Sequence, residues 1–297
     1  MTQQTTNTSP APDALRNRYV FDGKLEMRTG LHIGGGKLTL SHSDNPVVVT
    51  PDGLPFIPGS SFKGVLRSTI EKLVASLPTN LGLRTCGLPV GEHPEVLCPT
   101  AHPEKIARER RQSRTQKDVE QVLERERKNL CDTCKLFGSP LAAARITVND
   151  LYLLDEQWSG TTQVRDGVAI DRDSETAKRT AKYDFEVVPV ATVFGLHLVI
   201  ENATRKDLQL ISIGLSEFMN GFGGVGGLRS RGLGACILDG LQIRYMEVTD
   251  ANRQQRLQRY LLRKKDGTDD GLDPIEKPQD FIDDHIKVLF EQTPSQL

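Results

Sequence analysis

The alternation of strand and helix patterns along the chain constrains its fold more than any other feature. Strand patterns alternate apolar and polar side chains, whereas helix patterns repeat apolar side chains every three to four residues. In chain order they are strand 19–30, helix 60–77, strands 144–155 and 184–202, helix 206–222 and strand 235–248. This β-α-β, β-α-β order predicts an α+β, ferredoxin-like (RRM-like) domain, an antiparallel sheet with both helices on one face. We expect the first helix to take Ser60 or Ser61 as its N-cap.

Three segments do not fit this core. Residues 82–135 separate the first helix from the second strand and hold four of the five cysteines. Residues 156–183 are polar and lie between two strands, which favours a projecting β-hairpin. We therefore divide the chain into a disordered tail at 1–16, a domain at 17–248 that contains both insertions, and a C-terminal helical appendage at 249–297.

Composition limits the classes of partner. The chain has 38 Lys and Arg against 39 Asp and Glu, a formal charge of −1, so binding of a polyanion must depend on local patches. A run of 18 apolar residues and a secretory signal are both absent from the sequence, which predicts a cytoplasmic protein with no membrane partner. Five cysteines in such a protein favour metal binding or buried thiols over disulfides.

Four cysteines bracket the first insertion. They are Cys86, Cys98, Cys131 and Cys134, and the last two stand in the sequence CDTCKLFG. Four thiolates suit a tetrahedral structural Zn²⁺, which would anchor a segment too small to form its own core. His93 and His102 are alternative ligands.

The start of the first helix is a candidate anion site. Residues 55–68 read PFIPGSSFKGVLRS, so that Ser60 and Ser61 offer hydroxyl and backbone N–H groups at the positive end of the helix dipole. Lys63 and Arg67 are four residues apart and share one face of the helix. The alternative is a capped amphipathic helix with a solvated basic edge.

Two glycine-rich segments stand near the two ends of the predicted domain. Residues 30–36 read GLHIGGG, and residues 221–235 read GFGGVGGLRSRGLGA and hold Arg229 and Arg231. Glycine lets the backbone pass close to a ligand, and a guanidinium can engage a phosphodiester through paired hydrogen bonds. The second segment therefore predicts binding of a polyanion, and the alternative is a flexible linker.

Asp44 follows the first glycine segment, in the loop sequence SDNP, between His42 and Pro46. A polar side chain on such a loop is a candidate for function, and the alternative is an Asx-turn that prepares the proline.

A charged run occupies residues 103–130, with an excess of basic side chains. Such runs are usually solvated helices, and the alternative is a helix that faces a nucleic-acid groove.

Four of these motifs, taken in order, resemble a known family. They are GLHIGGG at 30–36, DNPV at 44–47, GLPFIPGSSFKGVLRS at 53–68 and GFGGVGGLRSRGLGA at 221–235. Their combination is similar to the backbone subunits of type III CRISPR effector complexes, which are members of the RAMP superfamily. The resemblance covers residues 18–248.

The resemblance implies a ferredoxin-like palm that binds the CRISPR RNA and a hairpin, the thumb, that kinks the guide–target duplex. Residues 164–194 are similar to the thumb region. The residues implied in RNA binding are His32, Gly34, Gly35, Ser60, Ser61, Lys63, Arg67, Gly223, Gly224, Arg229 and Arg231. The implied partners are CRISPR RNA, complementary target RNA, other effector subunits, and further copies or paralogues of this chain.

The resemblance also implies a metal-dependent endoribonuclease. Asp44 stands at the position of the family's catalytic aspartate, where Mg²⁺ or another divalent ion would assist attack of a 2′-hydroxyl on the adjacent phosphate. The products would carry a 2′,3′-cyclic phosphate and a 5′-hydroxyl. The cysteine cluster is similar to insertions in parts of the family. The alternative function is a non-catalytic, structural RNA-binding backbone subunit.

Overall fold

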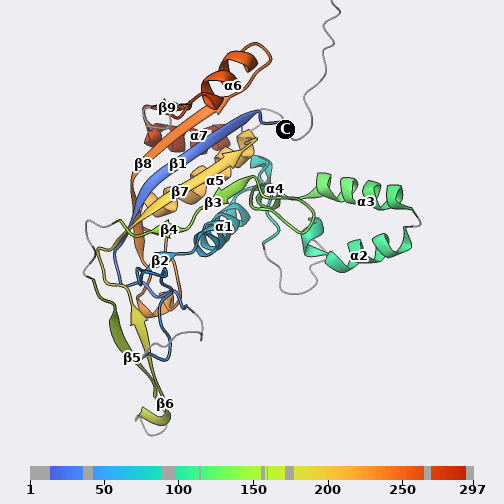
Figure 1. Ribbon diagram of the computed structural model, residues 1–297. Coiled ribbons are helices and arrows are strands. Elements are labelled where there is room, and N and C mark those ends of the chain that lie inside the picture. The colour runs from blue at the N-terminus through green and yellow to red at the C-terminus, as the bar shows by residue number, and fades with distance from the viewer. Residues whose placement is uncertain are drawn as a thin grey trace, which may run out of the picture.

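A five-stranded antiparallel sheet forms the centre of the protein (Figure 1). The computed structural model describes residues 14–35, 43–87, 98–113, 115–154, 158, 160–170, 177–263 and 269–291. Its strands lie in the order β3-β7-β1-β8-β9, and every neighbouring pair is antiparallel. They are β1 (Asn17–Met27), β3 (Ile146–Val148), β7 (Val193–Glu201), β8 (Cys236–Glu247) and β9 (Asp273–Ile275).

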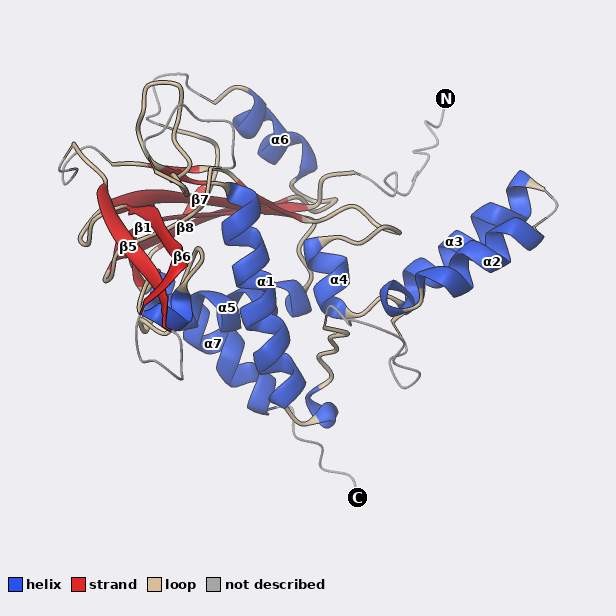
Figure 2. Ribbon diagram, turned by 90° about the horizontal axis from the view of Figure 1, so that it is seen from below, coloured by secondary structure: helices blue, strands red, loops and turns tan. Residues whose placement is uncertain are grey.

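Helices cover one face of this sheet, as Figure 2 shows. They are α1 (Gly59–Ser76), α5 (Arg205–Met219) and α7 (Pro278–Glu291). The core lies between the two layers, because alternate β7 side chains from Phe194 to Ile200 are buried against apolar side chains such as Leu66 and Leu215. The mixed α+β architecture expected from the sequence patterns is therefore confirmed.

A separate two-stranded antiparallel sheet extends away from the main sheet (Figure 1). It consists of β5 (Gln163–Ile170) and β6 (Ala177–Val187), in the segment where the polar residues predicted a hairpin. At its base, Leu31 and Val188 exchange both backbone hydrogen bonds, at 2.9 and 2.8 Å. The hairpin is thereby joined to the segment that follows β1. A second short pair, β2 (Phe56–Ile57) and β4 (Leu151–Tyr152), flanks the start of α1.

Three local predictions are wrong. The pattern at 144–155 predicts one strand, but it divides into β3 and β4, which belong to different sheets. The pattern at 184–202 was predicted as one strand, but it divides into the end of β6 and β7, because Pro189 has no N–H for a ladder and Ala191 adopts a φ of 61°. The N-cap of α1 is Pro58, and neither Ser60 nor Ser61 caps the helix. The helix starts earlier because Gly59 lacks a Cβ, which would lie 2.3 Å from the Val148 carbonyl oxygen.

The first insertion forms a helical arm that projects from the core (Figures 1 and 2). The arm is the antiparallel pair α2 (Pro103–Gln112) and α3 (Gln116–Asn129), followed by α4 (Asp132–Phe137), and single helical turns lie at Thr79–Leu81 and Pro99–Ala101. Within α2 and α3 only Ile106 and Glu126 are buried, so this charged run forms solvated helices.

The C-terminal segment contributes to the main core. β9 extends the sheet beside β8, and Ile282 and Leu289 of α7 are buried in the core. Helix α6 (Arg253–Leu261) lies over the opposite face of the sheet (Figure 2). The predicted tail at residues 1–13 lies outside the described residues. Among the helices that the structure describes, we find none both long and apolar enough to cross a bilayer.

Candidate functional site

The first glycine segment lies between two other parts of the chain. On one side Gly35 N–H donates to the Pro46 carbonyl at 2.9 Å and Val48 N–H to the Ile33 carbonyl at 2.8 Å. On the other side Gly227 N–H donates to the His32 carbonyl at 2.8 Å, and the His32 Nδ1 lies 2.7 Å from the Glu186 carbonyl oxygen. His32, Gly34 and Gly35 are thereby held against the Asp44 loop, the end of β6 and the second glycine segment.

Asp44 is exposed and contacts β6 directly. Its N–H donates to Oδ1 of Asp184 at 2.5 Å, and the Asp184 N–H donates to Oδ2 of Asp44 at 3.3 Å. Among the residues that the structure describes, none donates a hydrogen bond to the other oxygen, Oδ1 of Asp44. One carboxylate oxygen is therefore held by β6, and the side chain as a whole is exposed. His42, named with it in the sequence, lies outside the described residues.

The second glycine segment folds back on the first. Gly226 has a φ of 81°, and a Cβ there would lie 2.5 Å from the His32 carbonyl oxygen. Gly234 has a φ of 80°, and its Cβ would lie 2.0 Å from the Val225 carbonyl oxygen. Both positions therefore require glycine, and the segment is a packed loop instead of the flexible linker that the sequence left open.

Both arginines of this loop have exposed side chains. The Arg229 Nη1 donates to the Gly224 carbonyl at 2.9 Å, and Arg231 contacts the hydroxyl of Tyr183 on β6. Each guanidinium uses one nitrogen in these contacts, which leaves further N–H donors directed to solvent. Gly223 and Gly224 belong to the same loop, beside Arg229.

A cleft of about 600 Å³ lies between this loop and the middle of α1. Its lining includes Lys72, Glu217, Gly223, Gly224 and Arg229. The sequence pattern pointed to Lys63 and Arg67 on this helix and did not single out Lys72. At roughly 3.6 residues per turn, nine residues place Lys72 about half a turn away from Lys63, on the other side of the helix.

The start of α1 lies at a different place. The Gly59 N–H donates to Oδ1 of Asp150 at 2.7 Å, so an acidic side chain already occupies the first free donor of the helix. Ser60 is exposed and Ser61 is half-buried. The Lys63 Nζ donates to the Ile146 carbonyl of β3 at 3.0 Å. Burial, and then the charge of Arg67, lower the pKa of Lys63 below its ordinary value.

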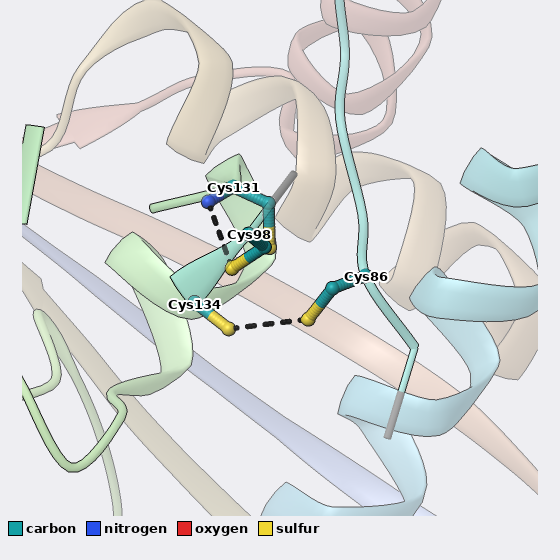
Figure 3. Close-up of side chains that lie close together, drawn as sticks. All are labelled: Cys86, Cys98, Cys131 and Cys134. Carbon is teal, nitrogen blue, oxygen red and sulfur yellow. Dashed lines mark hydrogen bonds between the residues drawn. The ribbon is translucent and has the colours of Figure 1, made fainter. Parts of the chain in front are cut away.

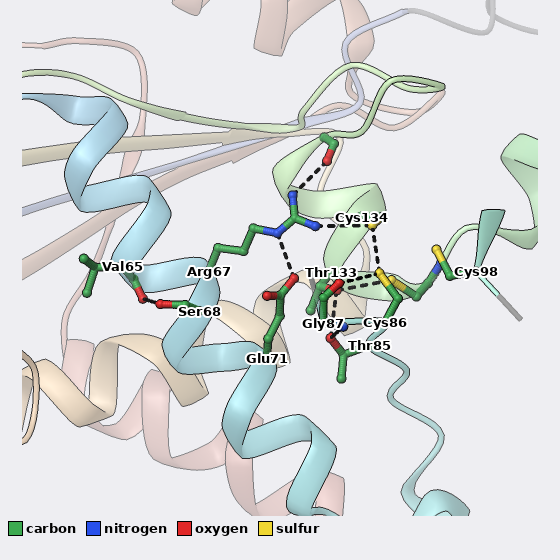
Figure 4. A network of polar contacts seen from close by, with 12 residues as sticks. Val65, Arg67, Ser68, Glu71, Thr85, Cys86, Gly87, Cys98, Thr133 and Cys134 are labelled. Carbon is green, nitrogen blue, oxygen red and sulfur yellow. Dashed lines mark hydrogen bonds and ion pairs between the residues drawn. The ribbon is translucent and has the colours of Figure 1, made fainter. Parts of the chain in front are cut away.

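Arg67 points inward, toward the cysteines (Figure 4). Its Nε donates to Glu71 at 2.8 Å, Nη1 to the Gly138 carbonyl at 3.1 Å and Nη2 to Cys134 Sγ at 3.4 Å. The side chains of Arg67 and Glu71 are only 15% and 8% exposed. All three nitrogens are engaged within the protein, so Arg67 joins α1 to α4, while the phosphate contact suggested by the sequence stays a prediction.

The four cysteines of the insertion come together (Figure 3). Their Sγ atoms all lie within 4.8 Å of one another, and Cys86 Sγ is 3.6 Å from Cys134 Sγ. The Cys131 N–H donates to Cys98 Sγ at 3.4 Å. Among the described residues this is the one group of three or more His, Cys, Asp or Glu that can reach a single ion, and it does not include His102. The other alternative ligand, His93, lies outside those residues.

Hydrogen bonds within the cluster divide the four thiols into two kinds. A hydrogen bond with Cys131 lowers the pKa of Cys98 far below its usual range, and one with Cys134 lowers the pKa of Cys131 to about 6. Hydrogen bonds with Cys131 raise the pKa of both Cys86 and Cys134. These shifts favour the thiolate at Cys98 and Cys131 and the thiol at Cys86 and Cys134, and the thiolate is the form that binds a metal.

Comparison with known proteins agrees with this geometry. The sequence model of the RAMP superfamily matches residues 24–237, which include both glycine segments, Asp44, α1 and the cysteine cluster. A CRISPR system Cms endoribonuclease Csm3 from Methanothermobacter thermautotrophicus is 24% identical over 257 residues, 77% of this chain and 86% of the relative. One from Enterococcus italicus is 27% identical over 222 residues, 74% of this chain and 89% of the relative.

A third relative, of the same name and from Methanocaldococcus jannaschii, is 43% identical over a shorter stretch of 60 residues. Because the superfamily match spans well over half of the chain and runs through every motif that meets at the hairpin base, this protein belongs to the RAMP superfamily.

Proposed function

We propose that this protein is a CRISPR-RNA-binding backbone subunit of a type III interference complex and cleaves RNA complementary to the guide. The observation that carries the proposal is the meeting of four separate segments at the base of the β5–β6 hairpin. These are residues 31–35, the loop 44–48, the end of β6 and the loop 223–234. Two relatives named as CRISPR endoribonucleases support the same function.

The strand order supports a ferredoxin-like palm. Strands β3, β7, β1 and β8 are adjacent in the sheet in that order. Along the chain, α1 lies between β1 and β3, and α5 lies between β7 and β8. Two β-α-β units interleaved in one antiparallel sheet produce this arrangement. The β5–β6 hairpin would be the thumb that enters the guide–target duplex.

Guide binding would depend on the exposed donors around the hairpin base. Arg229 and Arg231 supply guanidinium groups, and Lys72 adds a charge across the cleft from Arg229. Such contacts hold the phosphate backbone irrespective of base, while base pairing with the guide selects the target. Other effector subunits, and further copies or paralogues of this chain, would extend the surface along the RNA.

Cleavage would depend on Asp44. Its exposed carboxylate has one oxygen free of contacts from described residues, and Mg²⁺ usually takes one or two carboxylates with water and phosphate as the other ligands, so this loop fits such an ion. When bound, a divalent ion lowers the pKa of the attacking 2′-hydroxyl and offsets charge on the phosphate. Asp44 would orient the reacting ribose and phosphate for in-line attack.

The cysteine cluster would hold a structural Zn²⁺. Four sulfurs about 2.3 Å from a zinc ion are roughly 3.8 Å apart, close to the 3.6 Å between Cys86 and Cys134. Zinc here would connect the segments before and after the helical arm to α4. Few apolar side chains are buried around the cluster, namely Ile106, Leu130 and Leu141, so the metal would supply stability that this small core lacks.

The test is Asp44→Asn in the reconstituted complex with Mg²⁺. Periodic cleavage of a complementary RNA should be lost while assembly and target binding stay normal, since asparagine preserves the shape and the hydrogen-bond acceptor but not the charge. Periodic cleavage that persists in this variant while assembly is normal would show that the catalytic assignment of Asp44 is wrong.

A further inference from the structure

Asp184 is the residue of β6 that contacts Asp44, 140 positions away in the sequence. It lies near the end of the return strand of the hairpin, where the strand meets the main body of the protein (Figure 1). We infer that Asp184 is a positioning residue that holds Asp44 in its cleavage geometry. The inference rests on the proposed function and deepens it.

Three polar groups of Asp184 contact two consecutive residues of the loop. Its Oδ1 accepts the Asp44 N–H at 2.5 Å, its own N–H donates to Oδ2 of Asp44 at 3.3 Å, and its carbonyl accepts from Nδ2 of Asn45 at 3.2 Å. The first two contacts form a reciprocal pair, in which each aspartate binds the other's main chain. Such a pair fixes both the position of the Asp44 backbone and the direction of its carboxylate.

The next residue on the same side of the strand continues this attachment. The Glu186 N–H donates to the Asn45 carbonyl at 3.0 Å, and Oε2 of Glu186 accepts the Val47 N–H at 3.1 Å. Pro46 and Val47 are buried, so this end of the loop is anchored without Asp184. Asp44 is exposed, and Asp184 makes two hydrogen bonds with it.

This arrangement leaves Asp184 with a role that Glu186 cannot fill. Glu186 holds the buried part of the loop, whereas Asp184 alone accepts the Asp44 N–H. In-line attack on a phosphate is sensitive to placement, and a shift of about 1 Å can cost on the order of 100-fold in rate. Because β6 also belongs to the hairpin proposed to enter the RNA duplex, Asp184 connects the carboxylate of Asp44 to the element that shapes the substrate.

The experiment compares four variants in the complete reconstituted complex, loaded with guide RNA and Mg²⁺. Asp184→Ala removes the acceptor for the Asp44 N–H, and Asp184→Asn keeps it without the charge. Asp44→Asn tests the proposed function itself. Asp52→Ala is the matched control, because Asp52 is an exposed aspartate in a turn eight residues further along the chain and makes no hydrogen bond or ion pair with a described residue. Single-turnover cleavage, target affinity and amide exchange at residues 44–48 are measured for each.

We expect Asp184→Ala to slow cleavage by about 10- to 100-fold at saturating target, with target affinity unchanged and faster exchange of the Asp44 amide. Asp184→Asn should restore the rate to within about threefold, because its amide oxygen still accepts the hydrogen bond. Wild-type cleavage by Asp184→Ala, or equal damage by both Asp184 variants, would overturn the inference. If instead Asp44→Asn cleaves normally, the proposed function fails, and that result is distinct from the other two.

Discussion

The Arg67 guanidinium donates to the Sγ of Cys134 at 3.4 Å and, through its Nε, to Glu71 at 2.8 Å (Figure 4). Arg67 and Glu71 are one turn apart on α1, while Cys134 belongs to α4. The arginine thereby joins the central helix to the cysteine cluster. Burial alone would lower the pKa of Arg67, but the contacts with Glu71 and Cys134 raise it, so the charge is kept.

Replacing Arg67 with alanine should destabilise the protein by about 3 kcal/mol, since a carboxylate 8% exposed at Glu71 would lose its partner. Adding Glu71→Leu should recover most of this loss, because both members of the pair are then gone. Urea unfolding measures both variants. Lys287→Ala, on the exposed side of α7, is the control and should change the free energy of unfolding by less than about 0.5 kcal/mol.

The same Arg67 variants also test the RNA contact suggested by the sequence. If Arg67 is structural, the folded double variant should bind guide RNA with the affinity and salt dependence of the original protein. A reduced salt slope in the folded double variant would show instead that Arg67 contacts a phosphate.

The cysteine cluster should hold about one zinc ion per chain, as a single four-coordinate site requires. Cys134→Ser should lose most of this zinc after dialysis against a chelator, and the arm formed by α2 and α3 should become sensitive to protease. Cys236→Ser is the matched control, because Cys236 is buried in the main core, outside the cluster, and burial raises its pKa to about 12. Elemental analysis gives the outcome, and a zinc content near zero in the unmodified protein would contradict the site.

The sequence predicted the parts of the fold that carry a strong local period. The helix patterns that became α1 and α5 repeat apolar side chains over four or more turns, and strand β7 alternates buried and less buried side chains along its whole length. The pattern at 184–202 predicts a single strand because both of its halves are strands. Only Pro189 and the positive φ of Ala191 mark the turn that separates them.

The roles of polar residues were harder to predict. Lys63 and Arg67 share a helix face, as expected, but the sequence does not say that β3 and α4 pack against that face. The contact between Asp44 and Asp184 joins residues 140 positions apart, and a local pattern carries no sign of it. The grouping of the cysteines could be predicted, because four thiols that flank one insertion can all bind the same ion. In the structure their Sγ atoms lie within 4.8 Å of one another.

The ion pairs of Asp273 in β9 with arginines of α6 should make the stability of the protein depend on pH. Partial burial alone would raise its pKa, but hydrogen bonds from Arg256 and Arg259, at 2.6 and 2.7 Å, lower it. A carboxyl with a lowered folded-state pKa stabilises the protein above its unfolded pKa of about 3.9, and this contribution is lost as the pH falls through the folded value.

Asp273→Asn should therefore lower the free energy of unfolding at pH 7 by less than about 1 kcal/mol, because the side chain is 40% exposed and solvent screens the pair. The difference from the original protein should shrink below about pH 4. Urea unfolding at pH 7, 5 and 3 checks the trend. An equal difference at all three values would show that Asp273 acts through shape and not through charge.

The loop arginines should set the salt dependence of guide binding. Replacing Arg229 and Arg231 together with alanine removes two exposed guanidinium groups beside the cleft and β6. If each neutralises one phosphate of a single strand, the slope of log K against log salt should fall by roughly 1.4. The control removes two exposed charges elsewhere, with Lys277→Ala and Lys287→Ala on or next to α7, and should leave the slope unchanged. An equal slope for both double variants would place the guide on another surface of the protein.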